Sequence, residues 1–269
     1  MSAAERAGQA HDPTDAWELA EEAAEDATAD DAAGHDGPGH GAPVAPVPLQ
    51  PELAPSWLRP LLHGVRDVDA VRLSQHRIPA PPTARPASVL IAFGEDPVHG
   101  PDVLLVERAS TLRDHAGQVA FPGGGAEPGD ADEVATALRE AEEETGLAPS
   151  GVVPVAVLPR LHLPHSGFLV TPVVAHWARP VAVRAVDPAE TATVVRAPLA
   201  ALTDPANRMR IRHSSGMTGN AFSVAGLIVW GFTGGLLSAL LDLGGWARPW
   251  DESRVVDLDK AWSTARSGR

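Results

Sequence analysis

Four glutamates fall within five consecutive residues near the middle of the chain. No proline or glycine interrupts Val134–Thr145, where alanine, leucine, glutamate and arginine, all good helix formers, dominate. At about 100° per residue, Glu140, Glu143 and Glu144 share one third of the helix surface, and Glu142 points away from them. The other side carries Val134, Leu138, Ala141 and Thr145. The segment therefore predicts a helix with one apolar face for packing and one face of clustered carboxylates.

Clustered carboxylates of this kind suit divalent cations. Like charges at positions i, i+3 and i+4 of a helix repel by about 0.2–0.5 kcal/mol per pair, so the cluster is favourable only when cations bind to it. Mg²⁺ prefers oxygen ligands and commonly bridges carboxylates and substrate phosphates. Gly123 and Gly124, just before the helix, give the backbone the freedom to turn tightly beside a phosphate. The alternative is a solvated acidic helix face without a ligand.

The order of these parts resembles the signature of a known family. Residues 124–147 are similar to the Nudix box, in which a glycine, a spacer, a glutamate and a second spacer precede Arg-Glu-apolar-x-Glu-Glu-x-Gly-apolar. The second half matches at every fixed position: Arg139, Glu140, Ala141, Glu143, Glu144, Gly146 and Leu147. In the first half the loop is one residue longer, and the early acid is Asp130 or absent. The resemblance implies an α+β fold, the α/β/α sandwich of the Nudix fold, with a mixed sheet between helices and a loop-helix-loop catalytic motif.

A second resemblance covers Leu104–Gly124 and concerns the coenzyme A pyrophosphatase branch of this family. The matching residues are Arg108, Arg113, His115, Gly117, Phe121, Pro122, Gly123 and Gly124. Val106 and Ala109 replace a threonine and a serine of the branch signature. The resemblance implies that this segment lines the site and that its arginines hold the 3′-phosphate or the diphosphate of coenzyme A, for which the planar guanidinium is suited. The alternative is that these arginines and the histidine are structural, as partners of nearby acids or of the backbone.

The family resemblance also implies the chemistry. Mg²⁺ or Mn²⁺ on the three clustered glutamates would bridge the diphosphate and activate a water, while Arg139 would hold a carboxylate of the box in place. Glu190 resembles a further carboxylate that several members supply from a loop after the box, and capping its own loop is the alternative role. The base that takes the proton of the water stays open between a box glutamate, Glu190 and His115. For coenzyme A the products would be 4′-phosphopantetheine and adenosine 3′,5′-bisphosphate.

Three functions follow from these observations. The first is a coenzyme A pyrophosphatase. The second is a diphosphate hydrolase acting on ADP-ribose, NADH or another nucleoside diphosphate derivative, which the generic box alone supports. The third is a catalytically inactive Nudix module that binds a nucleotide as a sensor, and the intact glutamates argue against it. The expected partner is a small-molecule diphosphate, coenzyme A-like in the first case, and a homodimer stays open. Nothing indicates a nucleic-acid surface, which needs a basic stripe.

Charge and composition divide the 269 residues into four segments. Residues 1–50 hold eleven acids and one arginine, which accounts for −10 of the net charge of −14 and leaves −4 for the rest. Their low apolar content predicts a disordered acidic tail. A helical extension and linker (51–84), a Nudix hydrolase domain (85–245) and a C-terminal tail (246–269) are expected to follow. The chain has no cysteine and its start lacks the apolar core of a secretory signal, so the cytoplasm is the expected compartment.

Apolar patterning predicts the elements that position the site. Strands are expected at 89–93, 103–106, 152–158 and 168–175, a helix over Trp57–Leu62, and a hairpin formed by 209–213 and 222–224. Residues 224–243 are almost continuously apolar and approach the length of about 20 residues that spans a membrane. Because four glycines interrupt them, a strand that enters a helix is expected there, and no membrane partner.

Overall fold

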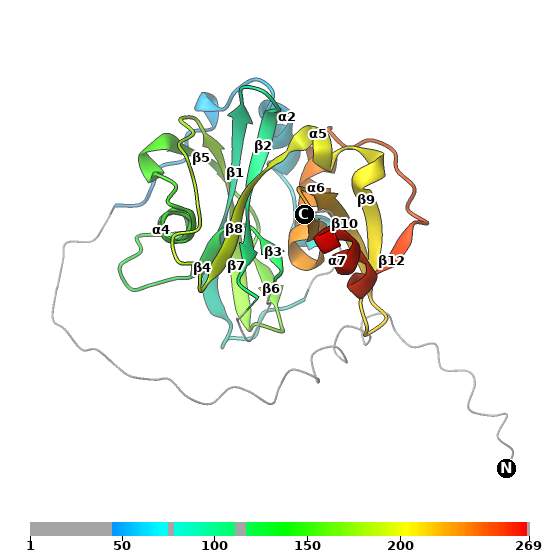
Figure 1. Ribbon diagram of the computed structural model, residues 1–269. Helices are drawn as coiled ribbons and strands as arrows, with labels where there is room; N and C mark the ends of the chain where they lie inside the picture. The colour runs from blue at the N-terminus through cyan, green and yellow to red at the C-terminus, as the bar shows by residue number, and fades with distance from the viewer. Residues whose placement is uncertain (1–44, 75–77, 111–116, 268–269) are drawn as a thin grey trace, which may run out of the picture.

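A mixed sheet of eight strands forms the larger part of the computed structural model, which describes residues 45–74, 78–110 and 117–267 (Figure 1). Its strands are β1 (Arg85–Asp96), β2 (Gly100–Arg108), β3 (Val119–Ala120), β4 (Gly123–Gly125), β5 (Val152–Val157), β6 (Leu161–Leu163), β7 (Phe168–Trp177) and β8 (Thr191–Pro198). The central strand β1 runs parallel to β7 and antiparallel to β2 and β4. β5 and β6 pair with β7, and β3 and β8 pair with β2.

The two faces of this sheet carry separate apolar cores, because the side chains of a strand alternate between the faces. In β1, Leu90 faces helix α4 (Glu133–Thr145). Its neighbour Ile91 faces the other core, which includes residues of helices α2 (Arg59–Val65) and α6 (Gly231–Leu243). Figure 1 shows α4 on one side of the sheet and α2 and α6 on the other. The fold is therefore the α+β sandwich that the sequence predicts, with a mixed sheet between helices.

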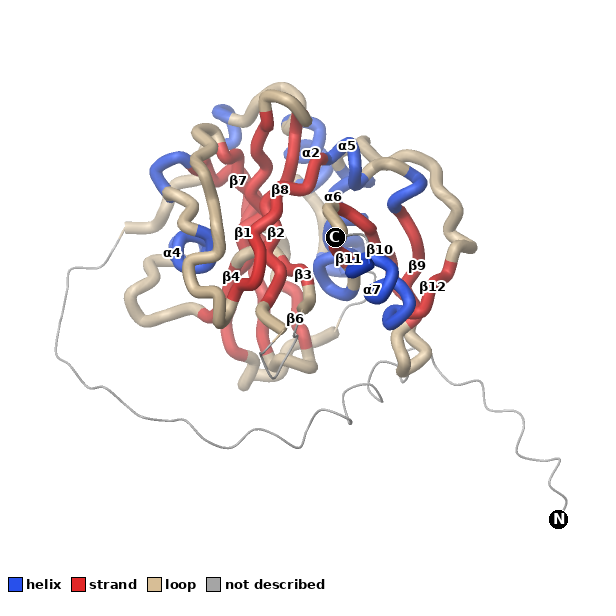
Figure 2. The backbone as a smooth tube through the Cα atoms, in the orientation of Figure 1, coloured by secondary structure: helices blue, strands red, loops and turns tan. Residues whose placement is uncertain are grey.

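Four further strands of the described chain form a second sheet beside the first (Figure 2). In sheet order they are β11 (Leu227–Val229), β10 (Thr218–Val224), β9 (Arg208–Arg212) and β12 (Val255–Asp257). β9 and β10 form the expected antiparallel hairpin, and β12 adds to β9 in parallel. Where the sequence predicts a polar tail over 246–269, the chain instead forms β12 and helix α7 (Leu258–Ser267). Leu258 and Ala261 of α7 are buried against β9, which explains why this short segment is ordered.

A buried arginine connects the second sheet to α6 and to the segment before β12. The side chain of Arg208 donates a hydrogen bond to Ser238 Oγ at 2.7 Å. Its guanidinium lies 4.9 Å from the ring centroid of Phe222 and 4.7 Å from that of Trp250. Burial lowers the pKa of Arg208. Desolvated contacts of this kind between a cation and a ring are stronger than exposed ones, so Arg208 stabilises the C-terminal segment on the sheet.

Helix α2 begins at Arg59, later than the expected start at Trp57, and ends at Val65. Pro60 lies in its first turn, where a missing N–H is tolerated and the fixed φ suits a helix start. Trp57 precedes the helix, donates its indole N–H to Glu95 Oε2 (3.3 Å) and packs against Trp246. The expected packing of this region on the main domain is confirmed. Most of the predicted acidic tail lies outside the described residues.

The remaining helical elements of the described chain are short. They are α3 (Ala70–Ser74), α5 (Leu199–Leu202) and single turns of 3₁₀ helix at Pro51–Leu53, Pro149–Gly151 and Pro205–Asn207.

Residues 224–243, which are almost continuously apolar, fold as the end of β10, then β11 and then α6, as the glycines predict. Within the described ranges, no helix combines the length and the apolar character needed to cross a bilayer.

Asp132 caps the N-terminus of α4 and also holds the chain that precedes α2. Its Oδ1 accepts a hydrogen bond from the N–H of Ala135 at 2.8 Å, and its Oδ2 accepts one from the N–H of Val47 at 2.7 Å. The helix ends at Thr145 because Gly146 adopts a φ of 68°, a left-handed conformation that favours glycine. These two ends determine which residues of α4 face β4.

Replacing Asp132 by alanine removes both hydrogen bonds, so the free energy of unfolding should fall by about 1 kcal/mol or somewhat more, the usual effect of losing an N-cap. Denaturant unfolding at pH 7 measures this. Asp132→Asn keeps one acceptor and should lose less, while Glu133→Gln, at the next position, should stay within about 0.5 kcal/mol of the parent. An Asp132→Ala protein as stable as the parent would contradict the capping role.

Candidate active site

The glycine strand β4 lies directly against α4. Gly124 pairs with Ser88 of β1, and a Cβ built on Gly124 would lie 2.5 Å from the carboxylate carbon of Glu140. A Cβ on Gly123 would overlap the carbonyl oxygen of Ser88. Gly123 is therefore required by space, because a side chain there would overlap the main chain of β1, whereas a side chain at Gly124 would displace the carboxylate of Glu140.

Glu144 reaches from α4 to the same strand. Its Oε2 accepts a hydrogen bond from the N–H of Gly123 at 3.1 Å. Burial raises the pKa of Glu144 to about 7; the bond from Gly123 and the positive charge of Arg108 oppose this rise, and the negative charges of Glu140 and Glu190 add to it. Without a cation, about half of the Glu144 carboxyl groups are therefore protonated at neutral pH.

Glu140 and Glu143 both contact the guanidinium of Arg139. Glu140 Oε1 lies 3.1 Å from Arg139 Nη1, and Glu143 Oε2 lies 3.0 Å from the same nitrogen. Burial raises the pKa of Glu140 although Arg139 lowers it, whereas 58% of the Glu143 side chain is exposed. The box glutamates are thus divided between Arg139 and β4. Among the residues with described positions, no three His, Asp or Glu side chains stand ready to ligate a metal.

The donor atoms nevertheless fit a hard divalent cation. Glu140 and Glu144 are carboxylates withdrawn from water, and burial destabilises the charged form of each. A cation beside them would relieve this cost, and carboxylate oxygens are the ligands that Mg²⁺ and Mn²⁺ prefer. For Glu143 to join them, its carboxylate would have to leave Arg139.

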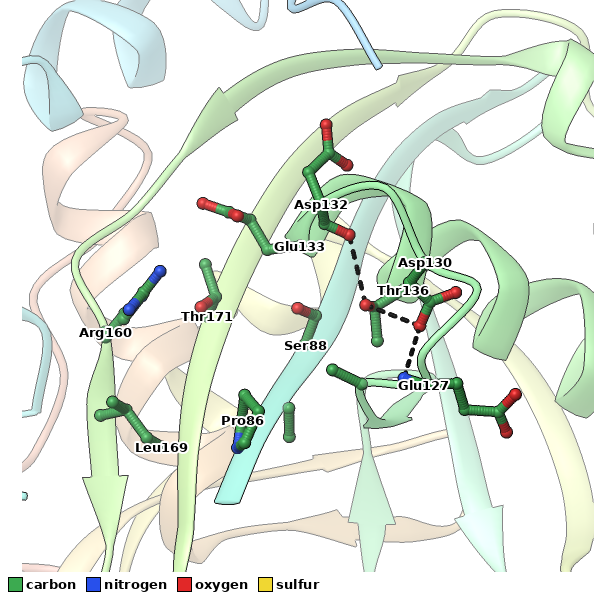
Figure 3. A pocket seen from close by; sticks show the side chains of 12 residues that line it. Pro86, Ser88, Glu127, Asp130, Asp132, Glu133, Thr136, Arg160, Leu169 and Thr171 are labelled. Carbon is green, nitrogen blue, oxygen red and sulfur yellow. Dashed lines mark hydrogen bonds between the residues drawn. The ribbon is translucent and has the colours of Figure 1, made fainter. Parts of the chain in front are cut away.

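Asp130 takes the place of the early acid of the box by holding Arg139. Its oxygens lie 3.0 Å from Nε and 3.1 Å from Nη2 of Arg139. It also accepts hydrogen bonds from the N–H of Glu127 and from Thr136 Oγ1, each at 2.9 Å (Figure 3). These contacts, with the bond from Arg139 the strongest, lower the pKa of Asp130. Asp130 therefore positions Arg139, which in turn contacts Glu140 and Glu143.

The other predicted site residues differ in where they lie. Arg108, at the end of β2, is close enough for its charge to act on Glu144, and its buried Nε has no hydrogen-bond partner among the described residues. The side chain of Glu190 is exposed, and its charge also acts on Glu144. The carbonyl of Glu190 accepts a hydrogen bond from the N–H of Ala109 at 2.8 Å, which joins its loop to β2. Arg113 and His115 lie outside the described residues.

A cavity of about 220 Å³ beside the loop before α4 contains a residue that sequence reasoning missed. Its polar lining comprises Ser88, Glu127, Asp130, Asp132, Glu133, Thr136, Arg160 and Thr171 (Figure 3). Arg160, just before β6, is the one cation among these described lining residues. No motif marks Arg160 in the sequence, because only the pairing of β6 with β7 brings it near the box.

The overlap at Gly123 can be tested with a matched pair of variants. Gly123→Ala places a methyl group against the main chain of Ser88 and Val89, which cannot rotate away, so unfolding free energy should fall by about 1–3 kcal/mol, as for other overpacked sites. In Gly129→Ala the new Cβ meets no atom within 4 Å. That variant should stay within about 0.5 kcal/mol of the parent in the same denaturant titration. Equal losses in both variants would refute the close approach.

The raised pKa of Glu144 predicts a pH-dependent stability in metal-free protein. The folded state holds the proton up to about pH 7, whereas the unfolded chain releases it near pH 4.5. Stability from this group is therefore present below pH 4.5 and is lost as the pH rises to 7, by at most about 3 kcal/mol. Glu144→Gln, which cannot ionise, should exceed the parent in unfolding free energy at pH 8 and match it near pH 4.5. Denaturant unfolding in EDTA at both pH values measures this difference, with Glu142→Gln, at an exposed position, as the control. A Glu144→Gln protein less stable than the parent at pH 8 would contradict the burial effect.

The sequence of the chain is similar to those of known proteins. The description "NUDIX domain" matches residues 83–213, from before β1 to just after β9. A Nudix hydrolase NudL of Photorhabdus laumondii, named as uncharacterized, is 41% identical over 136 residues, which span 49% of this chain and 71% of the relative. The NudL of Escherichia coli K12 is 50% identical over 90 residues, 34% of this chain and 45% of the relative, so this match spans about half of that protein. A solved Nudix hydrolase of M. smegmatis, RenU, superposes with a TM-score of 0.44 at 17% identity, covering 63% of this chain and 91% of that one. Since the first relative is matched over more than two thirds of its length and the box is intact from Arg139 to Leu147, the chain belongs to the Nudix hydrolase family.

Proposed function

We propose that this chain hydrolyses the diphosphate bond of coenzyme A or a derivative, yielding 4′-phosphopantetheine and adenosine 3′,5′-bisphosphate. The observation that carries the proposal is the placement of Leu104–Gly124. This run, which resembles the signature of the coenzyme A branch, begins in β2 and ends in β4, so Arg108 and Gly123 both act on Glu144. The branch-specific residues and the box thus meet at one carboxylate.

The two departures from the branch signature are compatible with this proposal. Val106 and Ala109 stand where the branch has hydroxyl residues, and they are only 1% and 4% exposed. Side chains buried to this extent in and after β2 do not reach a substrate. The lost hydroxyls therefore belong to the interior of the sheet and leave the substrate-facing residues unchanged.

The proposed metal site comprises Glu140, Glu143 and Glu144, with Mg²⁺ or Mn²⁺ as the ion. Such an ion neutralises the diphosphate and lowers the pKa of a bound water. Arg139, fixed by Asp130, keeps Glu140 and Glu143 on one side of α4. Glu144 must give up its proton before it can act as a ligand, because its pKa lies near 7.

Two further residues are proposed to act on the substrate. Arg108 contributes a positive charge beside Glu144, where it can pair with a phosphate oxygen. Glu190 is exposed, and its charge reaches Glu144, so it can accept the proton of the attacking water. Arg113 and His115 stay proposed as substrate contacts from the sequence resemblance alone.

Product analysis of the purified chain tests the proposal. With Mg²⁺ or Mn²⁺, coenzyme A should give adenosine 3′,5′-bisphosphate faster than ADP-ribose or NADH gives AMP. Glu144→Gln should lower kcat by at least about 100-fold, since loss of even an outer-shell partner of a metal costs 10–100-fold. Glu142→Gln, on the opposite side of the same helix turn, should keep kcat within about twofold.

The alternatives give different results in the same assay. Preferential cleavage of ADP-ribose or NADH would overturn coenzyme A as substrate and keep the hydrolase. Absence of cleavage with either ion, together with nucleotide binding that survives Glu144→Gln, would favour a non-catalytic sensor.

A further inference from the structure

A second cavity lies away from α4, between the two sheets. Its volume is about 920 Å³, and it is bounded by β6, by the hairpin of β9 and β10, and by the first turn of α6, with α3 along one side. Leu161 of its lining belongs to the core on the opposite face of the sheet from α4. Most of the cavity therefore lies on the face of the sheet opposite to the box glutamates, and it shares Arg160 and Leu169 with the smaller cavity beside α4.

The charge of this cavity is opposite to that of the chain. Arg160, His162, Arg210 and His213 line it, and none of its described lining residues is Asp or Glu. The whole chain carries a net charge of −14. Neither arginine forms an ion pair with a carboxylate of the described residues. Arg160 also lines the smaller cavity beside α4, whose lining includes Glu127, Asp130, Asp132 and Glu133. Arg210 lines only the larger of these two cavities, and a guanidinium without a carboxylate partner among the described residues is suited to bind an anion.

Arg210 is positioned by a neutral hydrogen-bond acceptor, which leaves its positive charge without a counter-charge. Its Nη2 donates a hydrogen bond to Thr218 Oγ1 at 2.9 Å, across the hairpin. Beside it, the rings of His213 and Trp230 stack at 5.7 Å with an interplanar angle of 15°. Buried nitrogens of two lining rings, His162 Nδ1 and Trp230 Nε1, have no hydrogen-bond partner in the described chain. Buried polar atoms are normally paired, so this lining is incomplete without further polar atoms.

The rest of the lining is apolar. Leu163 of β6 and Phe232 of α6 are partly exposed and belong to this lining, behind which Leu161, Ile211 and Leu236 are buried. Binding sites for organic molecules typically combine such apolar walls with a few polar groups that orient the ligand. A small inorganic anion would leave these walls uncovered, whereas a neutral apolar ligand would leave the arginines unpaired.

We propose that this cavity binds an amphipathic organic anion, with its carboxylate or phosphate at Arg210 and its apolar part against Leu163 and Phe232. The anion can be a free molecule or part of the diphosphate substrate. The sheet register makes both sources feasible: Gly124 pairs with β1, β1 pairs with β7, and β7 pairs with Leu161. The cavity wall thus begins about 14 Å from the glycine strand, three strand spacings away.

The test uses decanoate below its micelle concentration as the probe, with decanol as its uncharged counterpart. Isothermal titration is performed on the full chain in EDTA, so neither metal nor turnover is involved. Arg210→Gln removes the charge, and Gly235→Phe fills the cavity from α6, where a Cβ meets no atom within 4 Å. Arg212→Gln on the same strand, outside the lining and paired with Asp257, and Gly235→Ala are the matched controls.

Decanoate should bind the parent, and Arg210→Gln and Gly235→Phe should each weaken it about tenfold or more, the usual effect of losing a charge-assisted hydrogen bond or the space for the ligand. Both controls should stay within about twofold, and decanol should bind at least about tenfold more weakly. No binding to the parent, or equal binding by parent and Gly235→Phe when thermal unfolding shows both are folded, would overturn the proposal. Equal affinity for decanol would overturn the anionic character.

A kinetic experiment then separates the two sources of the anion. If decanoate raises the KM for coenzyme A in the parent and not in Gly235→Phe, the cavity holds part of the substrate. If the KM is unchanged while binding in EDTA is lost in Gly235→Phe, the ligand is a separate molecule. Both results support the anion site. The binding measurement in EDTA tests this site whether or not the chain hydrolyses coenzyme A.

Discussion

Carboxylates held against bare main chain are the constraint on which the rest of this structure depends. Glu140 and Glu144 are withdrawn from water beside Gly123 and Gly124, an arrangement that raises the pKa of both acids and opposes folding at neutral pH. The apolar face of α4, buried on β1 and β7, offsets this cost. The contact of Asp130 with Arg139 then prevents the acidic face from turning away. The buried carboxylates of Glu140 and Glu144 thus lower the stability of the domain, and a bound cation would restore it.

The sequence predicts most of the parts whose formation is local. The helix over Val134–Thr145, the central strands and the hairpin of β9 and β10 are found because their apolar spacing is regular over enough residues. Elements that form only by pairing with a distant strand cannot be predicted in this way. β12, for example, is three residues long and is a strand only because it pairs with β9. The same limit applies to Asp130, whose contact with Arg139 depends on the path of a loop, and to Arg160, which tertiary structure alone brings near the box. Spacing can indicate which side chains share a helix face, but not which partners they meet.

The part of the chain that matches the family ends within the second sheet, and the residues after it lie outside the match. The Nudix match ends at residue 213, just after β9. Beyond that point β10, β11, β12 and α7 complete an apolar core with β9, and α6 joins the core on the sheet face opposite α4. The 920 Å³ cavity crosses this boundary, because Arg160 and Arg210 of its lining lie before residue 213, and Trp230 and Leu236 lie after it. A fold shared by a family does not by itself determine the ligand, which depends on the residues of the particular site.

The parallel pairing of β1 with β7 has a consequence for how the protein is made. Arg85 pairs with Phe168, so the two halves of this ladder are far apart in the chain, and α4 lies in the connection between them. Closing such a long connection is entropically costly and slow compared with forming local contacts. Because α4 packs on β7 as well as on β1, its apolar face cannot be fully buried during synthesis until the ribosome has released the residues of β7. Until then the helix has only β1 and β4 to pack against, and β8 joins the other edge of the sheet later still.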